Sequence, residues 1–356
     1  MACAVALGAA ACSSDGSSMA ATASSGGEAS AGRPVQGVST SGAAQELQQQ
    51  YQSVVKAVLP SVVEIAAGDA TGSGVVYDGK GDIVTNAHVV GNATTVEVGT
   101  AEGGSRQGQM MQAKVVGTFA ADDLAVVRVS SGAGSLHPAT FGPSGSAATG
   151  QIVLAMGSPL GLSGSVTQGI ISAVGRTVSE GGTAPGATPT TIINALQTSA
   201  DINGGNSGGA LVNLSGQVIG IPAAAAQNPS SGNQAAGIGF AIPSATVTNI
   251  AGQLIKTGKV SNSGRASLGV SAHNATSSGG QPGGVAVVSV VPGGAADKAG
   301  IKAGDVITAV GGQQVPDTTT LTAVLATAKP GMKVPVQYSR DGGTAEATVT
   351  LGNLEG

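Results

Sequence analysis

The sequence contains no tryptophan, and aromatic residues make up only 2% of its 356 positions. Both cysteines, Cys3 and Cys12, lie in the first twelve residues. The rest of the chain therefore has no disulfide, no reactive thiol and no cysteine ligand for zinc. Because aromatic side chains are scarce and the net charge is −4, nothing favours a nucleic-acid partner. A folded core must be built from valine, isoleucine, leucine and alanine.

Histidine is also scarce, which limits the chemistry the chain can perform. Only His88, His137 and His273 are present, so any imidazole base must be one of these three. His137 and His273 have no motif around them, and we expect both at the surface. We expect no metal ion and no cofactor.

The first twelve residues predict an export signal. Residues 2–11 are small and apolar, and Cys12 is followed by a polar serine and glycine tract. This arrangement is typical of a bacterial lipoprotein signal over residues 1–12, in which Cys12 would become the lipidated first residue. The alternative is an alanine-rich disordered terminus. No stretch reaches the roughly 18 apolar residues of a membrane-spanning helix.

Residues 13–45 are rich in serine, glycine and alanine and predict a flexible tether. With a lipid anchor at Cys12, the protein would be exported to the cell envelope and held on the extracytoplasmic side of a membrane. Helical spacing of apolar residues begins near Gln45 and predicts a helix over 45–59, which Pro60 would end.

Short valine and isoleucine runs separated by glycine fill residues 61–242. Turn signals about every ten residues indicate antiparallel barrels or sandwiches, and no intervening helical patterns favour a parallel sheet. A helix is predicted over 244–257, a linker over 258–264, and a compact α+β unit after it. The expected strands of the first unit are 62–65, 73–77, 82–85, 115–117, 124–129, 151–155, 169–174, 192–194, 210–212 and 217–221, and those of the second unit are 268–270, 285–290, 334–338 and 345–351.

A glycine-rich segment, NGGNSGGALV at 203–212, places Ser207 on a tight turn. Glycines allow conformations that a Cβ forbids and let neighbouring N–H groups converge on a developing oxyanion. His88 ends an apolar run and Asp123 precedes another, so the order is histidine, aspartate, serine. A serine hydroxyl needs an imidazole to take its proton, and a carboxylate to hold that imidazole in the right tautomer. The neighbouring Asp122 is a rival for the carboxylate, and since adjacent strand residues face opposite sides, only one of the two can serve.

Several longer strings resemble the HtrA/Deg family of serine proteases. They are TGSGVVYD, GDIVTNAHVV, ADDLAVVRV, GSPLGLSGSVTQGIISAVGR, QTSADINGGNSGGALVNLSGQVIGI and GIGFAIPS, with GVAVVSVVPGGAADKAGIKAGDVITAVGGQQV in the second unit. The resemblance implies a mainly β fold, with a chymotrypsin-like double β-barrel protease domain over 46–258 followed by a small α+β PDZ domain over 264–354. It also implies that Asp123, directly before Leu-Ala-Val, is the catalytic carboxylate.

The same resemblance implies roles for further residues. The N–H groups of Gly205 and Ser207 would form the oxyanion hole. Ile202 would line a small apolar S1 pocket, and Ile219, Gly220 and Ile221, with the segment near 237–240, would be edges that pair with a substrate strand. Leu268, Gly269 and Val270 would bind the carboxylate of a peptide C-terminus. A modest linker over 99–112 suggests a homotrimer.

Three positions depart from the family pattern: Ser199 replaces an acidic residue, Asp201 an alanine, and Gly204 a proline. An Asp201 that faced the S1 pocket would favour cleavage after lysine or arginine. If it faces solvent instead, Ile202 sets a small apolar preference. Gly204 adds backbone freedom beside the nucleophile, which would make the oxyanion hole easier to disorder in a resting state.

The predicted function is therefore that of a serine endopeptidase that hydrolyses unfolded or misfolded proteins in envelope quality control, with a PDZ domain that binds peptide C-termini. The alternative is a non-proteolytic chaperone or peptide-binding scaffold with a latent protease domain.

Overall fold

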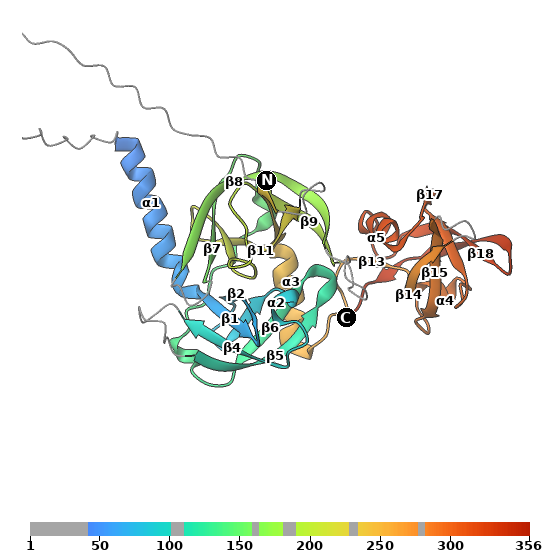
Figure 1. Ribbon diagram of the computed structural model, residues 1–356, viewed down its shortest axis with the longest axis horizontal. Helices are drawn as coiled ribbons and strands as arrows, with labels where there is room; N and C mark the ends of the chain where they lie inside the picture. The colour runs from blue at the N-terminus through green and yellow to red at the C-terminus, as the bar shows by residue number, and fades with distance from the viewer. Residues whose placement is uncertain (1–41, 101–109, 159–163, 181–189, 228–233, 277–281) are drawn as a thin grey trace, which may run out of the picture.

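Two closed six-stranded antiparallel barrels are followed by a smaller α+β unit (Figure 1). The computed structural model describes residues 42–100, 110–158, 164–180, 190–227, 234–276 and 282–356. The expected mainly β double-barrel fold with an α+β unit is confirmed. Cys12, the signal segment and most of the expected tether lie outside the described residues.

The first barrel has the strand order β1-β2-β3-β6-β5-β4. Valine and isoleucine fill its interior, as the scarcity of aromatic residues requires. Strands β3 and β6 pair directly. His88 follows β3 in the chain, and Asp123 directly precedes β6. The strands are β1 (Val62–Ala67), β2 (Ala70–Val76), β3 (Asp82–Thr85), β4 (Thr95–Thr100), β5 (Met110–Phe119) and β6 (Leu124–Val129).

The second barrel has the order β10-β11-β12-β9-β8-β7 and carries the glycine-rich segment ahead of β10. Its interior is packed with aliphatic side chains that include Ile171, Leu211 and Ile219. The strands are β7 (Ile152–Gly157), β8 (Ser165–Glu180), β9 (Thr190–Thr198), β10 (Ala210–Asn213), β11 (Val218–Gln227) and β12 (Gln234–Pro243).

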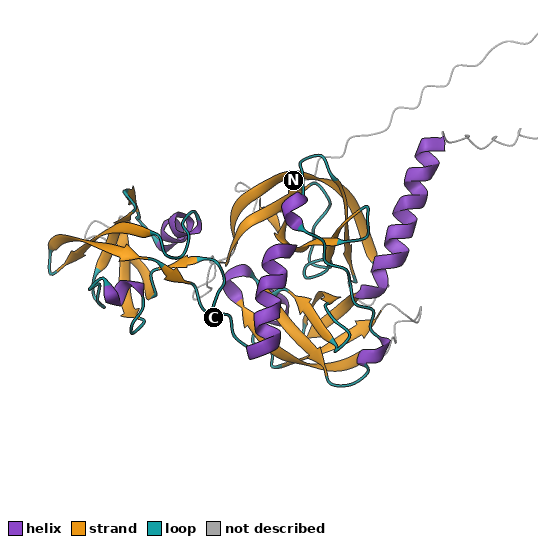
Figure 2. Ribbon diagram, turned by 180° about the vertical axis from the view of Figure 1, so that it is seen from behind, coloured by secondary structure: helices purple, strands orange, loops and turns teal. Residues whose placement is uncertain are grey.

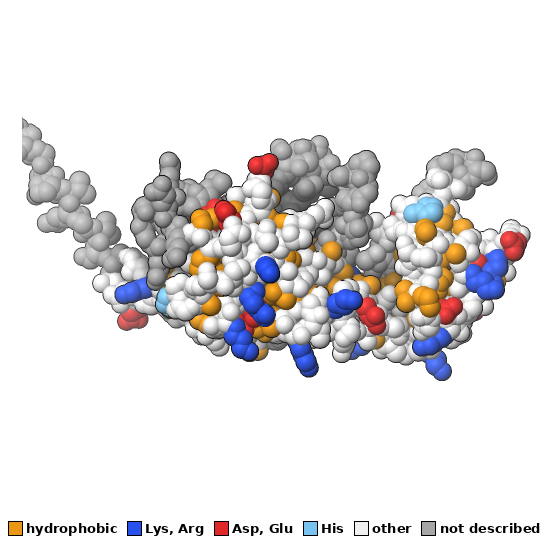
Figure 3. Space-filling view, turned by 90° about the horizontal axis from the view of Figure 1, so that it is seen from below, with side chains coloured by type: hydrophobic (Ala, Val, Ile, Leu, Met, Phe, Trp, Pro, Cys, Tyr) orange, Lys and Arg blue, Asp and Glu red, His pale blue; other side chains and the backbone are white. Residues whose placement is uncertain are grey.

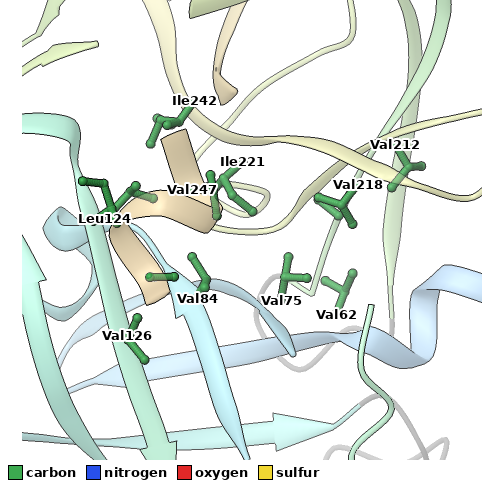
Figure 4. Packing of buried hydrophobic residues seen from close by; sticks show 14 of the residues in the cluster. Val62, Val75, Val84, Leu124, Val126, Val212, Val218, Ile221, Ile242 and Val247 are labelled. Atoms are coloured by element: carbon green, nitrogen blue, oxygen red, sulfur yellow. The ribbon is translucent and has the colours of Figure 1, made fainter. Parts of the chain in front are cut away.

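One shared core joins the barrels. Val84 and Leu124 of the first barrel and Ile221 and Ile242 of the second belong to one buried cluster, which Val247 of helix α3 (Ser244–Thr257) completes (Figure 4). Helix α3 crosses both barrels (Figure 2), and it ends at Gly258, whose left-handed conformation lets its N–H reach the Leu254 carbonyl. The relative position of the two barrels is therefore set by apolar burial.

The remaining helices of this part are short, apart from α1 (Gly42–Val58), which projects from the barrels (Figure 1). Helix α1 begins three residues before the expected 45, because two alanines with high helix propensity extend it toward the N-terminus. It continues into a 3₁₀ turn at Pro60. The short elements are η1 (Leu59–Ser61), α2 (Ala87–Val90), η2 (Ala120–Asp122), η3 (Ala133–Ser135) and η4 (Ser144–Ser146).

The C-terminal unit is a sheet of order β14-β15-β16-β18-β19 with two helices. The expected strand at 268–270 is wrong, because Gly269 adopts a positive φ of 70° and turns the chain between β13 and β14. Its elements are β13 (Ala266–Ser267), β14 (Val270–Thr276), β15 (Pro282–Val290), α4 (Ala295–Lys298), β16 (Val306–Val310), β17 (Gln313–Gln314), α5 (Thr318–Ala326), β18 (Lys333–Arg340), β19 (Gly343–Thr350) and β20 (Gly352–Asn353).

Charged side chains are scattered over the described surface seen in Figure 3, with acidic groups interspersed among the basic ones. Among the described residues, no helix is both long and apolar enough to cross a membrane.

The neighbours Ile170 and Ile171 on β8 provide a matched test of the barrel core. Ile171 is fully buried, whereas 39% of Ile170 is exposed. We expect Ile171→Ala to lower the free energy of unfolding by about 2–5 kcal/mol through lost burial and a cavity, and Ile170→Ala to lower it by less than about 1 kcal/mol. Chemical denaturation followed by circular dichroism measures both. Equal losses would contradict the strand register.

Candidate active site

The segment that carries Ser207 is fixed against the first barrel by close backbone contacts. The Ser73 N–H donates to the Ser207 carbonyl at 2.9 Å, and the Thr85 hydroxyl donates to the Ser73 carbonyl at 2.6 Å. Gly208 has a φ of 81°, and a Cβ there would lie 2.2 Å from the Ser73 carbonyl oxygen. Only glycine fits this position. Ser207 therefore lies against strands of the other barrel, next to the chain that leads to His88.

His88 and Asp123 are in direct contact. His88 Nδ1 lies 2.7 Å from Asp123 Oδ2, and the His88 N–H donates to Asp123 Oδ1 at 2.9 Å. The Asp123 carbonyl accepts hydrogen bonds from Ala87 N–H and Asn86 Nδ2. His88 lies on the short helix α2 rather than on a strand end. Asp123 is 3% exposed, so both of its oxygens are held in a nearly dry setting that orients the imidazole.

Asp122 turns away from the imidazole and contacts Arg265 instead, at 2.8 Å. The expectation that the two aspartates alternate as strand neighbours is wrong. Asp122 ends the 3₁₀ turn η2, and Asp123 takes a left-handed φ of 52°, so the chain turn rather than the strand pleat separates them.

The two expected oxyanion donors lie on a loop that is bonded to itself. The Gly205 N–H donates to Asn203 Oδ1 at 3.0 Å, and the Ser207 hydroxyl donates to the Asn203 carbonyl at 3.3 Å. Asn206 closes the loop, with Nδ2 donating to the Asp201 carbonyl and Oδ1 accepting the Asn203 N–H. In this conformation the Gly205 N–H has an internal acceptor.

Ser73 is a residue whose role the sequence did not reveal. It is fully buried, and its hydroxyl donates to the Gly205 carbonyl at 2.7 Å while accepting the Ser158 N–H at 2.8 Å. Ser73 therefore fixes the loop at two points, the Gly205 carbonyl through its hydroxyl and the Ser207 carbonyl through its N–H. Its position in the string TGSG was a signal, but a small polar residue among glycines also suits an ordinary strand.

In the C-terminal unit, Leu268 and Gly269 lie in a turn before the edge strand β14. The Gly269 N–H donates to the Ser267 hydroxyl at 2.9 Å, the Leu268 carbonyl accepts from Ala296 N–H, and the Gly269 carbonyl accepts from Val291 N–H. Val270 begins β14, which pairs with β15 on one side, and α5 lies beside it. This is the arrangement in which a peptide adds a strand to a sheet edge.

Two family models match the chain: a trypsin-like peptidase domain over residues 72–221 and a PDZ domain over residues 266–351. Serine protease Do-like HtrA of Lactobacillus helveticus is 41% identical over 299 residues, covering 79% of this chain and 68% of that protein. The chain belongs to the HtrA family of serine proteases.

Two further similar proteins are also serine proteases. Serine protease PepD of Mycobacterium tuberculosis is 38% identical, with 85% of this chain and 66% of that protein covered. Periplasmic serine endoprotease DegP of Escherichia coli is 37% identical, with 79% and 57% covered. The chain thus spans less than two thirds of the length of both. The solved structure of the HtrA-type protease AlgW with a decapeptide is 29% identical, covers 85% of this chain and 98% of that one, and has a TM-score of 0.54.

Within this HtrA chain, the expected substrate edge at residues 219–221 is wrong. Gly220 pairs with Leu211 of β10 and with Pro243 of β12, so β11 is interior at this point. Ile219 and Ile221 are 2% and 0% exposed and belong to barrel cores. Strand β12 is likewise paired on both sides at Gly239. Sequence alone could not show this, because strand neighbours in a barrel come from distant segments.

Ile202 is buried beneath Gly239, where a Cβ would lie 2.3 Å from Ile202 Cγ1. Asp201 is exposed, and its carbonyl accepts hydrogen bonds from Thr167 and Asn206. The hydroxyl of Ser199 accepts the Ile170 N–H at 3.0 Å, which joins β8 to the end of β9.

His137 and His273 are exposed, as expected. Across the described residues, no group of three or more histidine, cysteine, aspartate or glutamate side chains could hold a metal ion.

Gly204, three residues before Ser207, and Gly208, directly after it, should differ sharply in their tolerance of a Cβ. We expect Gly208→Ala to lower kcat/KM by about 100-fold, because the clash with Ser73 displaces the nucleophile by a fraction of an ångström or more. Gly204 has open space around it and no positive φ, so Gly204→Ala should change kcat/KM by less than about 3-fold. Steady-state kinetics on a peptide substrate compares them. Similar losses in both variants would contradict the loop geometry.

Proposed function

We propose that this chain is a serine endopeptidase in which Ser207 is the nucleophile, His88 the general base and acid, and Asp123 the carboxylate that orients His88. The observation that carries the proposal is the 2.7 Å contact between His88 Nδ1 and the buried Asp123 carboxylate, on a framework bonded to the Ser207 loop. These residues have the chain order of the chymotrypsin-type triad.

Each group has a defined task in acyl transfer. The Asp123 carboxylate accepts a hydrogen bond from Nδ1–H of His88, which leaves Nε2 as the base that takes the Ser207 proton. The Ser207 oxygen then attacks the scissile carbonyl carbon. The N–H groups of Gly205 and Ser207 bind the resulting oxyanion, and donors of this kind contribute about 3 kcal/mol each. Substrate must therefore draw the Gly205 N–H away from Asn203 Oδ1. His88 then gives the Ser207 proton to the leaving amine as the C–N bond breaks, and water activated by His88 hydrolyses the acyl enzyme.

The substrate is an extended polypeptide that pairs with β11 beyond Pro222. Strand β10 pairs with β11 only as far as Gly220, and the Pro222 carbonyl accepts the Gly208 N–H beside the nucleophile. A strand added there would place its scissile bond against Ser207. Because only unfolded or loosely folded chains can supply an extended strand, the substrates are unfolded or misfolded proteins.

The relatives support a proposed cellular setting. DegP is described as periplasmic, which supports an extracytoplasmic place for this chain and a role in envelope protein quality control. Cys12 would supply a lipid anchor, with residues 13–41 as the tether. The assembly would be a homotrimer.

The PDZ domain binds peptide C-termini. The turn at Leu268 and Gly269 would receive the terminal carboxylate on backbone N–H groups, and the peptide would pair with β14 beside α5. The AlgW structure with a bound decapeptide supports peptide binding in this family.

Replacement of the nucleophile tests the enzyme directly. We expect the wild type to degrade casein, and Ser207→Ala to lose at least about 1,000-fold in rate because no other group can form the acyl intermediate. Gel analysis of casein over time measures this, with Ser215→Ala, on an exposed turn, as the control. If wild type and Ser207→Ala were equally inert, with and without C-terminal peptides, while both prevented aggregation of unfolded proteins, the chaperone or scaffold function would replace the proposal.

Cleavage-site mapping tests the S1 pocket. Because Ile202 is buried and Asp201 is exposed, we expect cleavage after small apolar residues such as valine and alanine, with the same preference in Asp201→Ala. Mass spectrometry of a peptide library gives the profile. Cleavage after lysine or arginine that Asp201→Ala abolishes would show that Asp201 reaches the pocket.

The PDZ interaction should depend on the terminal carboxylate. A peptide with a free C-terminus that binds should lose at least about 10-fold in affinity when it is amidated, since the charge-assisted bonds to N–H groups are lost. Isothermal titration calorimetry on the full chain measures both forms. Equal affinities would show that the peptide binds by its internal side chains.

A further inference from the structure

A buried ion pair joins the turn before Asp123 to Arg265, which directly precedes strand β13 at the start of the C-terminal unit. The side chains of Asp122 and Arg265 are 4% and 10% exposed. Arg265 Nη1 donates to Asp122 Oδ1 at 2.8 Å, to the Ala121 carbonyl, and to the Thr191 carbonyl at 3.0 Å. One guanidinium therefore bonds a turn of the first barrel to strand β9 of the second.

The turn held by Arg265 is the one that sets the position of Asp123. The Asp123 N–H donates to the Ala120 carbonyl at 3.1 Å and closes the 3₁₀ turn, after which the left-handed φ of Asp123 directs its carboxylate toward His88. The Thr190 hydroxyl also donates to the Ala120 carbonyl, at 3.2 Å. A shift of this turn would move the Asp123 backbone and, with it, the carboxylate.

Burying this ion pair costs desolvation free energy, which offsets much of the attraction between the two charges. Within the described residues, the second oxygen of Asp122 is buried and accepts no hydrogen bond. Burial raises the pKa of the Asp122 carboxyl, and the Arg265 charge opposes that rise. Buried ion pairs of this kind seldom stabilise a protein more than apolar side chains of similar volume would. The contacts of this pair, in contrast, are specific, because the one nitrogen Nη1 of Arg265 reaches acceptors on both barrels.

We propose that Arg265 and Asp122 are positioning residues for catalysis: together they fix the turn that holds the Asp123 carboxylate against His88. The inference rests on the proposed function of the triad, since it gives the reason why this turn must be fixed. Arg265 lies three residues before Leu268 in the chain. The backbone therefore runs directly from this ion pair into the turn proposed to bind peptides in the PDZ domain.

A second ion pair offers a matched control. Arg128 and Asp82 form a bidentate pair, with distances of 2.7 and 2.9 Å. The pair joins β3, which precedes His88 in the chain, to β6, which follows Asp123. Asp82 is fully buried, and the pair lies at the ends of the strands that are remote from His88 and Asp123. Its loss should affect stability without moving the triad.

The experiment compares Arg265→Ala, Arg265→Lys, the double variant Asp122→Ala with Arg265→Ala, and Arg128→Ala in the full chain. We expect Arg265→Ala to lower kcat by about 10- to 100-fold with KM within about 3-fold, because the triad is misplaced while substrate contacts remain. Arg265→Lys should restore part of kcat, since the ammonium restores the charge but sits on a shorter side chain than Nη1. Arg128→Ala should keep kcat within about 2-fold at temperatures where it is folded.

A spectroscopic signature follows the geometry independently of turnover. The His88 Nδ1 proton, hydrogen-bonded to Asp123, should give a low-field ¹H NMR resonance in the wild type and in Arg128→Ala that is lost in Arg265→Ala. The double variant leaves no unpaired buried charge, so it keeps the test valid if Arg265→Ala fails to fold.

Retention of both kcat and the low-field resonance in Arg265→Ala or in the double variant would overturn the inference, as would an equal loss in Arg128→Ala. An inert wild type would instead refute the proposed function, and the resonance would still decide whether Arg265 positions Asp123.

Discussion

The contact between the Ser207 loop and strand β2 is the constraint on which the site depends. The Ser73 N–H bonds to the Ser207 carbonyl, the Ser73 hydroxyl bonds to the Gly205 carbonyl, and the Thr85 hydroxyl bonds back to Ser73. The proposed nucleophile comes from the second barrel and its proposed partners from the first, so the proposed mechanism needs the two barrels in a fixed relative position. The apolar core around α3 sets that position, and the glycine at 208 permits the approach.

Hydrogen bonds hold the Asp123 turn and the Ser207 loop in different ways. The Asp123 carboxylate takes hydrogen bonds from both the backbone and the ring of His88, which orients the imidazole. On the other side of the same turn, Arg265 contacts both barrels. The loop that carries the proposed oxyanion donors differs in one respect, because the Gly205 N–H donates to Oδ1 of the exposed Asn203 within the loop itself. Under the proposed mechanism, the contact between His88 and Asp123 is already in place, and substrate has to break the bond between the Gly205 N–H and Asn203.

Much of the fold could be predicted from the sequence, because local signals agreed with it. Strand β3 and helix α3 match the predicted bounds to the residue. Gly81 precedes the short apolar run of β3, and α3 lies between Pro243 and Gly258 with apolar residues at helical spacing. Local patterns failed where tertiary contacts decide. The helix at His88, the 3₁₀ turn at Asp122 and the interior place of Gly220 all depend on segments far away in the chain. The role of Ser73 was hidden for the same reason.

Covalent labelling tests the central claim, that Ser207 is activated by His88 and Asp123 across the two barrels, most directly. A fluorophosphonate probe reacts with activated serines, and mass spectrometry locates the modified residue. The account predicts labelling at Ser207 alone in the wild type and a loss of labelling rate in His88→Ala and in Asp123→Asn, while the exposed His137→Ala is labelled as fast as the wild type. Labelling at another serine, or equal rates at Ser207 in His88→Ala and the wild type, would contradict it.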